Sequence, residues 1–247
     1  MSDYSKSVAS RQLENEIVSF TKDLLQGSNR ITGFITSDNS ESIYLALLAH
    51  KNYYFKLKGV NAPEIVIPET AHPAFERIAI ALEIKPIIVK VSKANPALSE
   101  KDFARKITSS TICIVGSCPN QCYGLIDPID SLSKLAGKYD TGLFIDASLG
   151  SFLLPFMGLE EITKTSKQIP KGLEINLSIK NMTAFICDTQ GYGMAPRGCS
   201  LLFYGNKDLH LASNYFQSEW IGGVYSANRL VEEKNTSAIA ATWSVMM

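Results

Sequence analysis

Residues 111–146 read TICIVGSCPNQCYGLIDPIDSLSKLAGKYDTGLFID, and their pattern indicates the fold class. It begins with an apolar run at 111–115, continues into an amphipathic segment at 128–139, and ends with a second apolar run, Gly142–Asp146. Uninterrupted apolar runs of this length are typical of strands that are buried on both faces. A helix between two such strands connects them in parallel, so we expect a β-α-β unit here.

The same alternation continues on both sides of this unit. The link between the last two apolar runs is too short for a helical crossover, so we expect the final strand to run antiparallel. Seven strands in all predict an α/β fold class, a three-layer sandwich with a mixed, mostly parallel seven-stranded sheet. The additional predicted strands are 31–36, 64–67, 86–91, 183–188 and 199–204, and the additional predicted helices are 40–56, 72–82 and 99–107.

The bulk composition fits one large domain. The chain has 247 residues, of which 45% are hydrophobic and 19% are charged, as is usual for globular proteins. Its 24 basic residues balance 24 acidic ones without a charge block, so we expect no nucleic-acid partner. Charged residues interrupt every long apolar stretch, so we expect no membrane span in this chain. We expect an N-terminal helical arm at 1–30, a large domain at 31–247, and a surface excursion at 158–174.

The number of cysteines and the N-terminal sequence together indicate the cellular compartment. The five cysteines are an odd number, and the polar N-terminus does not resemble a secretory signal. We therefore expect a cytoplasmic protein with ordinary thiols and no metal site.

Four polar segments follow predicted strands. In open α/β sheets, ligands bind beyond the carboxyl ends of the strands, so these segments are candidates for one site. Each segment taken alone has a structural explanation: a helix cap, a surface histidine, a loop-capping aspartate and a glycine turn. The four are 36–42, His72, Asp146 and 188–193.

Taken in order, these segments resemble the sphingosine-1-phosphate lyase family, within the pyridoxal-phosphate decarboxylases. The resemblance extends from about residue 11 to residue 247, and it implies the large domain of aminotransferase fold type I. The residues that carry it are Thr70-Ala71-His72-Pro73-Ala74-Phe75, Ile145-Asp146-Ala147-Ser148-Leu149-Gly150, the segment 188–198 and the segment 220–225.

The resemblance implies a role in binding pyridoxal phosphate for each candidate residue. Ser37, Asn39 and Ser40 would surround the phosphate at a helix N-terminus. His72 would stack on the pyridine ring, and Asp146 would pair with the protonated ring nitrogen.

The sequence departs from the family at the cofactor contacts. The family carries a His-Lys pair whose lysine forms the Schiff base, and this chain has Gln190-Gly191 instead. Glycine can neither hold the cofactor covalently nor move a proton. Lys180 precedes its strand, so we expect it at the opposite end of the sheet. In the phosphate loop, Asp38 replaces a glycine and adds a negative charge beside the expected phosphate.

These departures predict a lyase-like protein with impaired catalysis. The family reaction is pyridoxal-phosphate-dependent carbon–carbon cleavage of phosphorylated sphingoid bases, and we expect cofactor binding to be weak or lost. One alternative is an active carbon–carbon or carboxy lyase that uses another base. A second alternative is a non-catalytic dimer partner or interaction module, which an exposed apolar patch near Trp220 and Trp243 would support.

The resemblance also implies how the protein associates and where it acts. Family sites form between two subunits, so we expect a homodimer or a dimer with another family member, with 220–225 near the partner. The implied location is the cytoplasm, at the cytosolic face of the endoplasmic reticulum. Family members carry a membrane anchor and a small C-terminal domain, and we expect this chain to lack both.

Overall fold

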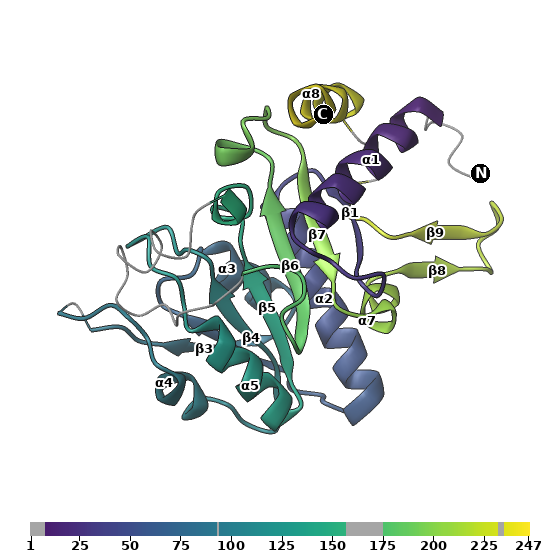
Figure 1. Ribbon diagram of the computed structural model, residues 1–247. Helices are drawn as coiled ribbons and strands as arrows, with labels where there is room; N and C mark the ends of the chain where they lie inside the picture. Colours follow the sequence, from purple (N-terminus) through teal and green to yellow (C-terminus); the bar gives the residue numbers. More distant parts are fainter. Residues whose placement is uncertain (1–7, 93, 157–174, 232–234) are drawn as a thin grey trace.

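The computed structural model describes residues 8–92, 94–156, 175–231 and 235–247 (Figure 1). The surface excursion expected at 158–174 lies outside these ranges. No helix among the described residues has the length and apolar character needed to cross a membrane.

A mixed seven-stranded sheet forms the centre of the molecule, as predicted. Its strand order is β1-β7-β6-β5-β4-β2-β3, and β7 alone runs antiparallel to its two neighbours, as expected for the last strand. The strands are β1 (Thr32–Thr36), β2 (Glu64–Pro68), β3 (Lys85–Val89), β4 (Thr111–Ser117), β5 (Gly142–Asp146), β6 (Met182–Asp188) and β7 (Ser200–Tyr204).

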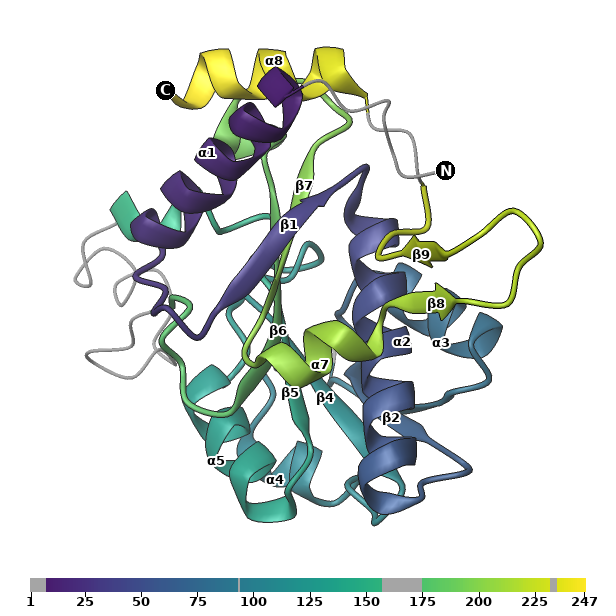
Figure 2. The same cartoon turned by 90° about the vertical axis from the view of Figure 1, so that its right-hand side faces the viewer.

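Helices cover both faces of this sheet (Figure 2). The helices α2, α3 and α7 lie on one face, and α1, α4 and α5 lie on the other. Helix α8 packs across α1, where the indole Nε1 of Trp243 donates a 2.6 Å hydrogen bond to Glu16. The bounds are α1 (Val8–Leu24), α2 (Asn39–Lys58), α3 (Ala74–Ala81), α4 (Glu100–Ala104), α5 (Ile129–Tyr139), α7 (Lys207–Ala212) and α8 (Thr236–Met246).

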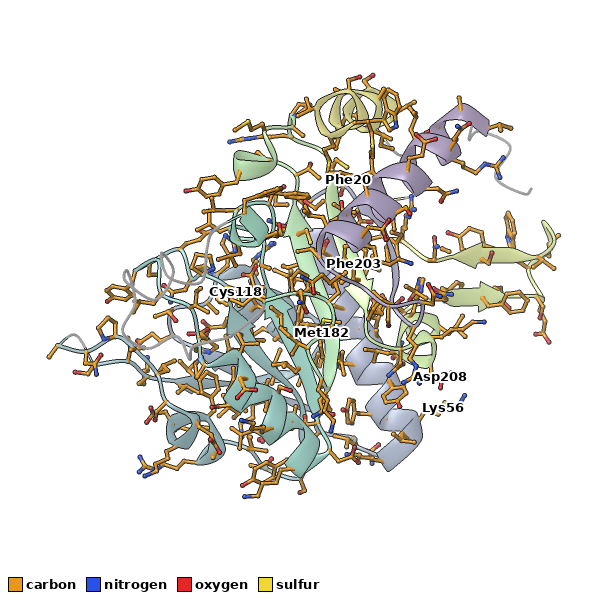
Figure 3. All side chains as sticks on the ribbon, in the orientation of Figure 1. Phe20, Lys56, Cys118, Met182, Phe203 and Asp208 are labelled. Carbon is orange, nitrogen blue, oxygen red and sulfur yellow. The ribbon has the colours of Figure 1, made fainter. Side chains whose placement is uncertain are left out.

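Two apolar cores lie between the sheet and its helices. Successive side chains of a strand point to opposite faces, so Phe144 packs in the core beneath α2 and α3, whereas Leu143 and Ile145 pack in the other core. Every residue of β5 is buried, which explains its uninterrupted apolar run. Figure 3 shows two members of the second core, Cys118 and Phe203, in the interior of the molecule.

A small hairpin projects from the body of the molecule. It consists of β8 (Tyr215–Gln217) and β9 (Tyr225–Ala227), paired in antiparallel fashion. Both ribbon views show it extending away from the main sheet beyond α7 (Figures 1 and 2). We did not predict this hairpin, nor α7 and α8, from the sequence.

Candidate cofactor site

The candidate site lies at the edge of the sheet where the parallel strands β1, β2, β4, β5 and β6 end. All the sequence-predicted site residues end or follow one of these strands. Polar side chains from separate parts of the chain contact one another here. Asn39, at the start of α2, donates a 3.0 Å hydrogen bond to Asp188 at the end of β6.

Asp146 is a buried carboxyl residue at this edge. It ends β5, with 7% of its surface exposed, and its Oδ1 accepts hydrogen bonds from the hydroxyl (2.6 Å) and the N–H (3.1 Å) of Ser148. The pKa of Asp146 is raised, and burial is the largest cause. The hydrogen bonds from Ser148 and the charge of His72 oppose this rise, while the charge of Asp188 adds to it. A buried carboxyl of this kind gains most from a cationic partner, such as a protonated ring nitrogen.

His72 lies at the same edge. Its side chain is exposed, and its Nδ1 accepts a 3.1 Å hydrogen bond from the N–H of Ala74, so that His72 helps to cap α3. Its charge is also close enough to Asp146 to lower the pKa of that carboxyl. The structure therefore places His72 and Asp146 on one side of the molecule. The ring-stacking role of His72 remains a prediction.

The three predicted phosphate ligands lie in the loop between β1 and α2 and in the first turn of α2. Ser37 donates from its N–H (2.7 Å) and its hydroxyl (2.8 Å) to Glu41 Oε2. The amide of Asn39 is directed to Asp188, and the hydroxyl of Ser40 accepts a 3.4 Å hydrogen bond from Arg77. Each of the three side chains thus has a partner within the protein.

Gln190 and Gly191 follow β6 beside this loop. Gln190 is exposed, and its N–H donates a 3.1 Å hydrogen bond to Asp188 Oδ1. Gly191 has a φ of +72°, and a Cβ added there would meet nothing within 4 Å. The position that the resemblance assigns to the Schiff-base lysine is therefore an open space above a left-handed backbone.

Glu41 is a buried residue of the site that sequence reasoning missed. Its Oε1 accepts hydrogen bonds from the N–H groups of Leu230 (3.1 Å) and Val231 (3.0 Å), while its Oε2 binds Ser37. One carboxylate thus connects the loop before α2 to the segment after β9. The spacing of Asp38 and Glu41 matches a capping box and was the available signal, but it does not reveal the distant partners.

Asp127 is a second missed residue. It directly precedes the amphipathic segment predicted at 128–139, and its Oδ2 accepts a 2.7 Å hydrogen bond from the N–H of Ser117 at the end of β4. The pKa of Asp127 is raised to about 7, mainly by burial, while the hydrogen bond from the Ser117 N–H lowers it and the charge of Asp146 adds to the rise. Asp127 is thus a buried carboxyl that belongs to the site edge.

Two described lysines are relevant to a substitute base. Lys180 precedes β6, at the opposite end of that strand from Asp188, as predicted. Lys90 lies on the site side, but its ammonium pairs with Glu69 at 2.8 Å. It also follows β3, which β2 and β4 separate from β5.

The mixed seven-stranded sheet and the polar edge of its parallel strands define the class of the molecule: the pyridoxal-phosphate-dependent transferases and decarboxylases. Within this class the chain belongs to the DegT/DnrJ/EryC1/StrS aminotransferase family, which matches residues 14–151.

Relatives with a more specific name match nearly the whole chain. It is 36% identical to a sphingosine-1-phosphate lyase of Oryza sativa subsp. japonica over 99% of its length, and 35% identical to sphingosine-1-phosphate lyase 1 of Rattus norvegicus over 96%. A solved sphingosine-1-phosphate lyase of Burkholderia pseudomallei superposes with a TM-score of 0.85 at 27% identity, covering 96% of this chain and 54% of that one. The chain spans 44% and 40% of the rice and rat proteins, less than half of each.

The residues at the site edge match only part of what pyridoxal phosphate requires. Asp146 suits a protonated ring nitrogen, and His72 lies nearby. Gly191 has no amine for covalent attachment, and Asp38 directs its carboxylate at the N-terminus of α2, where a phosphate would bind. Among the described residues that follow these strands, position 191 therefore offers no amine for a covalently held cofactor.

Proposed function

We propose that this chain is a sphingosine-1-phosphate lyase-like protein that has lost the covalent chemistry of its relatives. The reaction in question is pyridoxal-phosphate-dependent carbon–carbon cleavage of a phosphorylated sphingoid base. The observation that carries the proposal is Gly191, which stands where the resemblance requires a lysine. Without an amine at that position, the chain has no group there to hold the cofactor or to transfer a proton.

The backbone at Gly191 supports this proposal. A φ of +72° is favourable for glycine. Placing a residue with a Cβ in this left-handed conformation costs roughly 1–2 kcal/mol of conformational free energy. The loop is thus built around a glycine, and a lysine restored at this position would be strained unless the loop moved. The backbone at residue 191 is thus suited to glycine, so we infer that restoring the lysine alone would not restore catalysis.

Asp146 and His72 support a residual affinity for the cofactor ring. Bound pyridoxal phosphate supplies an electron sink, and the carboxylate of Asp146 would hold its ring nitrogen in the protonated form. We propose that this interaction alone binds the cofactor weakly, because covalent attachment is missing.

An active lyase with another base has less support. Lys180 is at the wrong end of β6, and Lys90 is paired with Glu69 beside an outer strand of the sheet. Neither lysine is placed to substitute for residue 191.

We further propose that two copies of the chain associate through the β8–β9 hairpin. A two-stranded hairpin is only marginally stable by itself in water. In this hairpin the ring centroid of Tyr225 lies 6.1 Å from that of Tyr215 and 6.3 Å from that of Trp220. Trp243, in contrast, is partly buried against α1. An exposed apolar cluster of this kind supports a contact with another protein surface. Its exposed members are Tyr215, Phe216, Trp220, Ile221, Val224, Leu230 and Val231.

Aldehyde release from a phosphorylated sphingoid base tests the proposed loss of catalysis. The natural chain should give only background release in the presence of pyridoxal phosphate, since general acid–base catalysis alone typically contributes 10²–10⁴-fold. Gly191→Lys should remain poorly active, and Gly191→Lys combined with Asp38→Gly and Asn39→Gly should bind the cofactor best. Release by the natural chain at ordinary enzyme rates would refute the proposal and indicate a substitute base.

A further inference from the structure

The N-terminus of α2 already binds a carboxylate of this chain. Asp38 is the N-cap residue of α2, and its Oδ1 accepts a 2.8 Å hydrogen bond from the N–H of Glu41. The backbone carbonyl of Asp38 accepts the next N–H, that of Ser42, at 3.2 Å. The bond from Ser42 is the first regular hydrogen bond of the helix, whereas the N–H of Glu41 is one of the donors that a helix N-terminus offers to an anion, and Asp38 already binds it.

The hydroxyl groups of the same loop are also bound within it. The hydroxyls of Thr36 and Ser42 lie 2.6 Å apart, and both also contact the carbonyl of Asp38 at 3.3 Å. The hydroxyl of Ser37 donates to Glu41. A phosphate arriving at this helix would have to displace these contacts to obtain the same donors.

The charges around the loop are mostly negative. Asp38 is exposed, and its charge contributes to raising the pKa of Asp188, which Asn39 connects to the loop. The Glu41 carboxylate lies in the first turn of the helix. Arg77 contacts Ser40 from α3. A phosphate would thus meet three carboxylates, against the guanidinium of Arg77 and that of Arg229, which lines the same pocket as Ser37 and Glu41 and pairs with Glu14 at 3.6 Å. This balance of charge disfavours phosphate binding.

From these contacts we infer that the carboxylate of Asp38 occupies the N-terminus of α2 and so prevents phosphate from binding there. The inference rests on the proposed function in one respect, namely that a phosphate-bearing ligand would come to this helix. It adds a second barrier to cofactor binding that is independent of Gly191. Restoring a lysine at residue 191 would leave this barrier in place.

The test measures binding of inorganic phosphate by isothermal titration, without cofactor or substrate. Asp38→Gly removes the carboxylate and frees the N–H of Glu41, and glycine is a tolerated N-cap residue, so this variant should fold. We expect it to bind phosphate at least tenfold more tightly than the natural chain. Asp38→Asn removes the charge but keeps a side chain that caps well, so its gain should be smaller.

Asp208→Asn is the matched control. It removes an exposed carboxylate from the first turn of α7, where Asp208 lies beside Lys56 near the opposite end of α2 (Figure 3). Its phosphate affinity should equal that of the natural chain. Circular dichroism and thermal unfolding would establish that each variant is folded.

Two results would overturn the inference. The first is equal phosphate affinity of the natural chain and Asp38→Gly, whether both bind or neither does. The second is an equal gain in phosphate affinity for Asp38→Asn and Asp38→Gly. This would mean that the negative charge of Asp38 alone excludes phosphate, and not its hydrogen bond with the N–H of Glu41. Neither result bears on Gly191, so failure here is distinguishable from failure of the proposed function, which aldehyde release measures.

Discussion

The proposed function depends mainly on single residues at the site edge. Among these residues, Asp127 has a raised pKa that can be tested directly. In the folded chain its pKa is about 7, whereas the ordinary value is 3.8. The folded state therefore keeps a proton that the unfolded state loses, and the stability contributed by this group is lost as pH rises from about 4 to about 7.

Asp127→Asn should remove that part of the pH dependence. Between pH 5 and pH 8 the variant should gain stability relative to the natural chain by up to about 3 kcal/mol, since pH 5 lies about two units below the folded-state pKa and one pKa unit corresponds to about 1.4 kcal/mol. Urea unfolding at the two pH values measures the difference. His50 is buried with a pKa of about 4, so it gives the opposite slope between about pH 4 and 6.5, but it does so in both chains. Identical pH profiles would show that Asp127 is not perturbed as described.

The sequence could place these residues only in part. Asp146 and His72 were predicted at the correct edge, because each follows an apolar run and strand ends are local features. The partners of Asp127 and Glu41 could not be predicted, because Ser117, Leu230 and Val231 come from other segments of the chain.

At the scale of elements, Glu41 connects the start of α2 to the segment that follows the hairpin. Its carboxylate accepts four hydrogen bonds, two from Ser37 and one each from Leu230 and Val231. Hydrogen bonds to a buried charged group contribute about 1.5–3 kcal/mol each in favourable cases. Glu41 is therefore a positioning residue for both segments.

Glu41→Gln should loosen this connection. A glutamine amide presents one acceptor and one donor to four N–H and O–H donors, so we expect a loss of about 2–3 kcal/mol in unfolding free energy. Hydrogen exchange at the amides of Leu230 and Val231 should accelerate at least tenfold. The control is Glu76→Gln, on the exposed side of α3. Unchanged exchange at the two amides would contradict the positioning role.

The main strands and helices were predictable because each has enough residues to show a period. The run Gly142–Asp146 is apolar throughout, and the observed strand is fully buried. The strands of the hairpin, Tyr215–Gln217 and Tyr225–Ala227, have three residues each, too few to establish an alternation. The aromatic side chains of Tyr215 and Phe216 are exposed, whereas aromatic residues in strands usually pack in a core.

At the scale of the whole molecule, the proposed association through the hairpin predicts a concentration-dependent dimer. Ile221 is fully exposed near the tip, so Ile221→Asp should place a charge in the contact and weaken association at least tenfold. Sedimentation equilibrium measures this directly. Ile80→Asp, on the exposed side of α3, should leave association unchanged. A natural chain that stays monomeric at high concentration would contradict the proposal.

The central claim is that this molecule keeps the fold of a pyridoxal-phosphate enzyme without its covalent anchor. The most direct measurement adds equimolar pyridoxal phosphate to the natural chain and to Gly191→Lys with Asp38→Gly and Asn39→Gly, reduces both with borohydride, and maps labelled peptides by mass spectrometry. We predict that no single lysine of the natural chain is labelled stoichiometrically, whereas the lysine introduced by Gly191→Lys is labelled in the variant. Stoichiometric labelling of one lysine in the natural chain, with a visible absorption band before reduction, would contradict it.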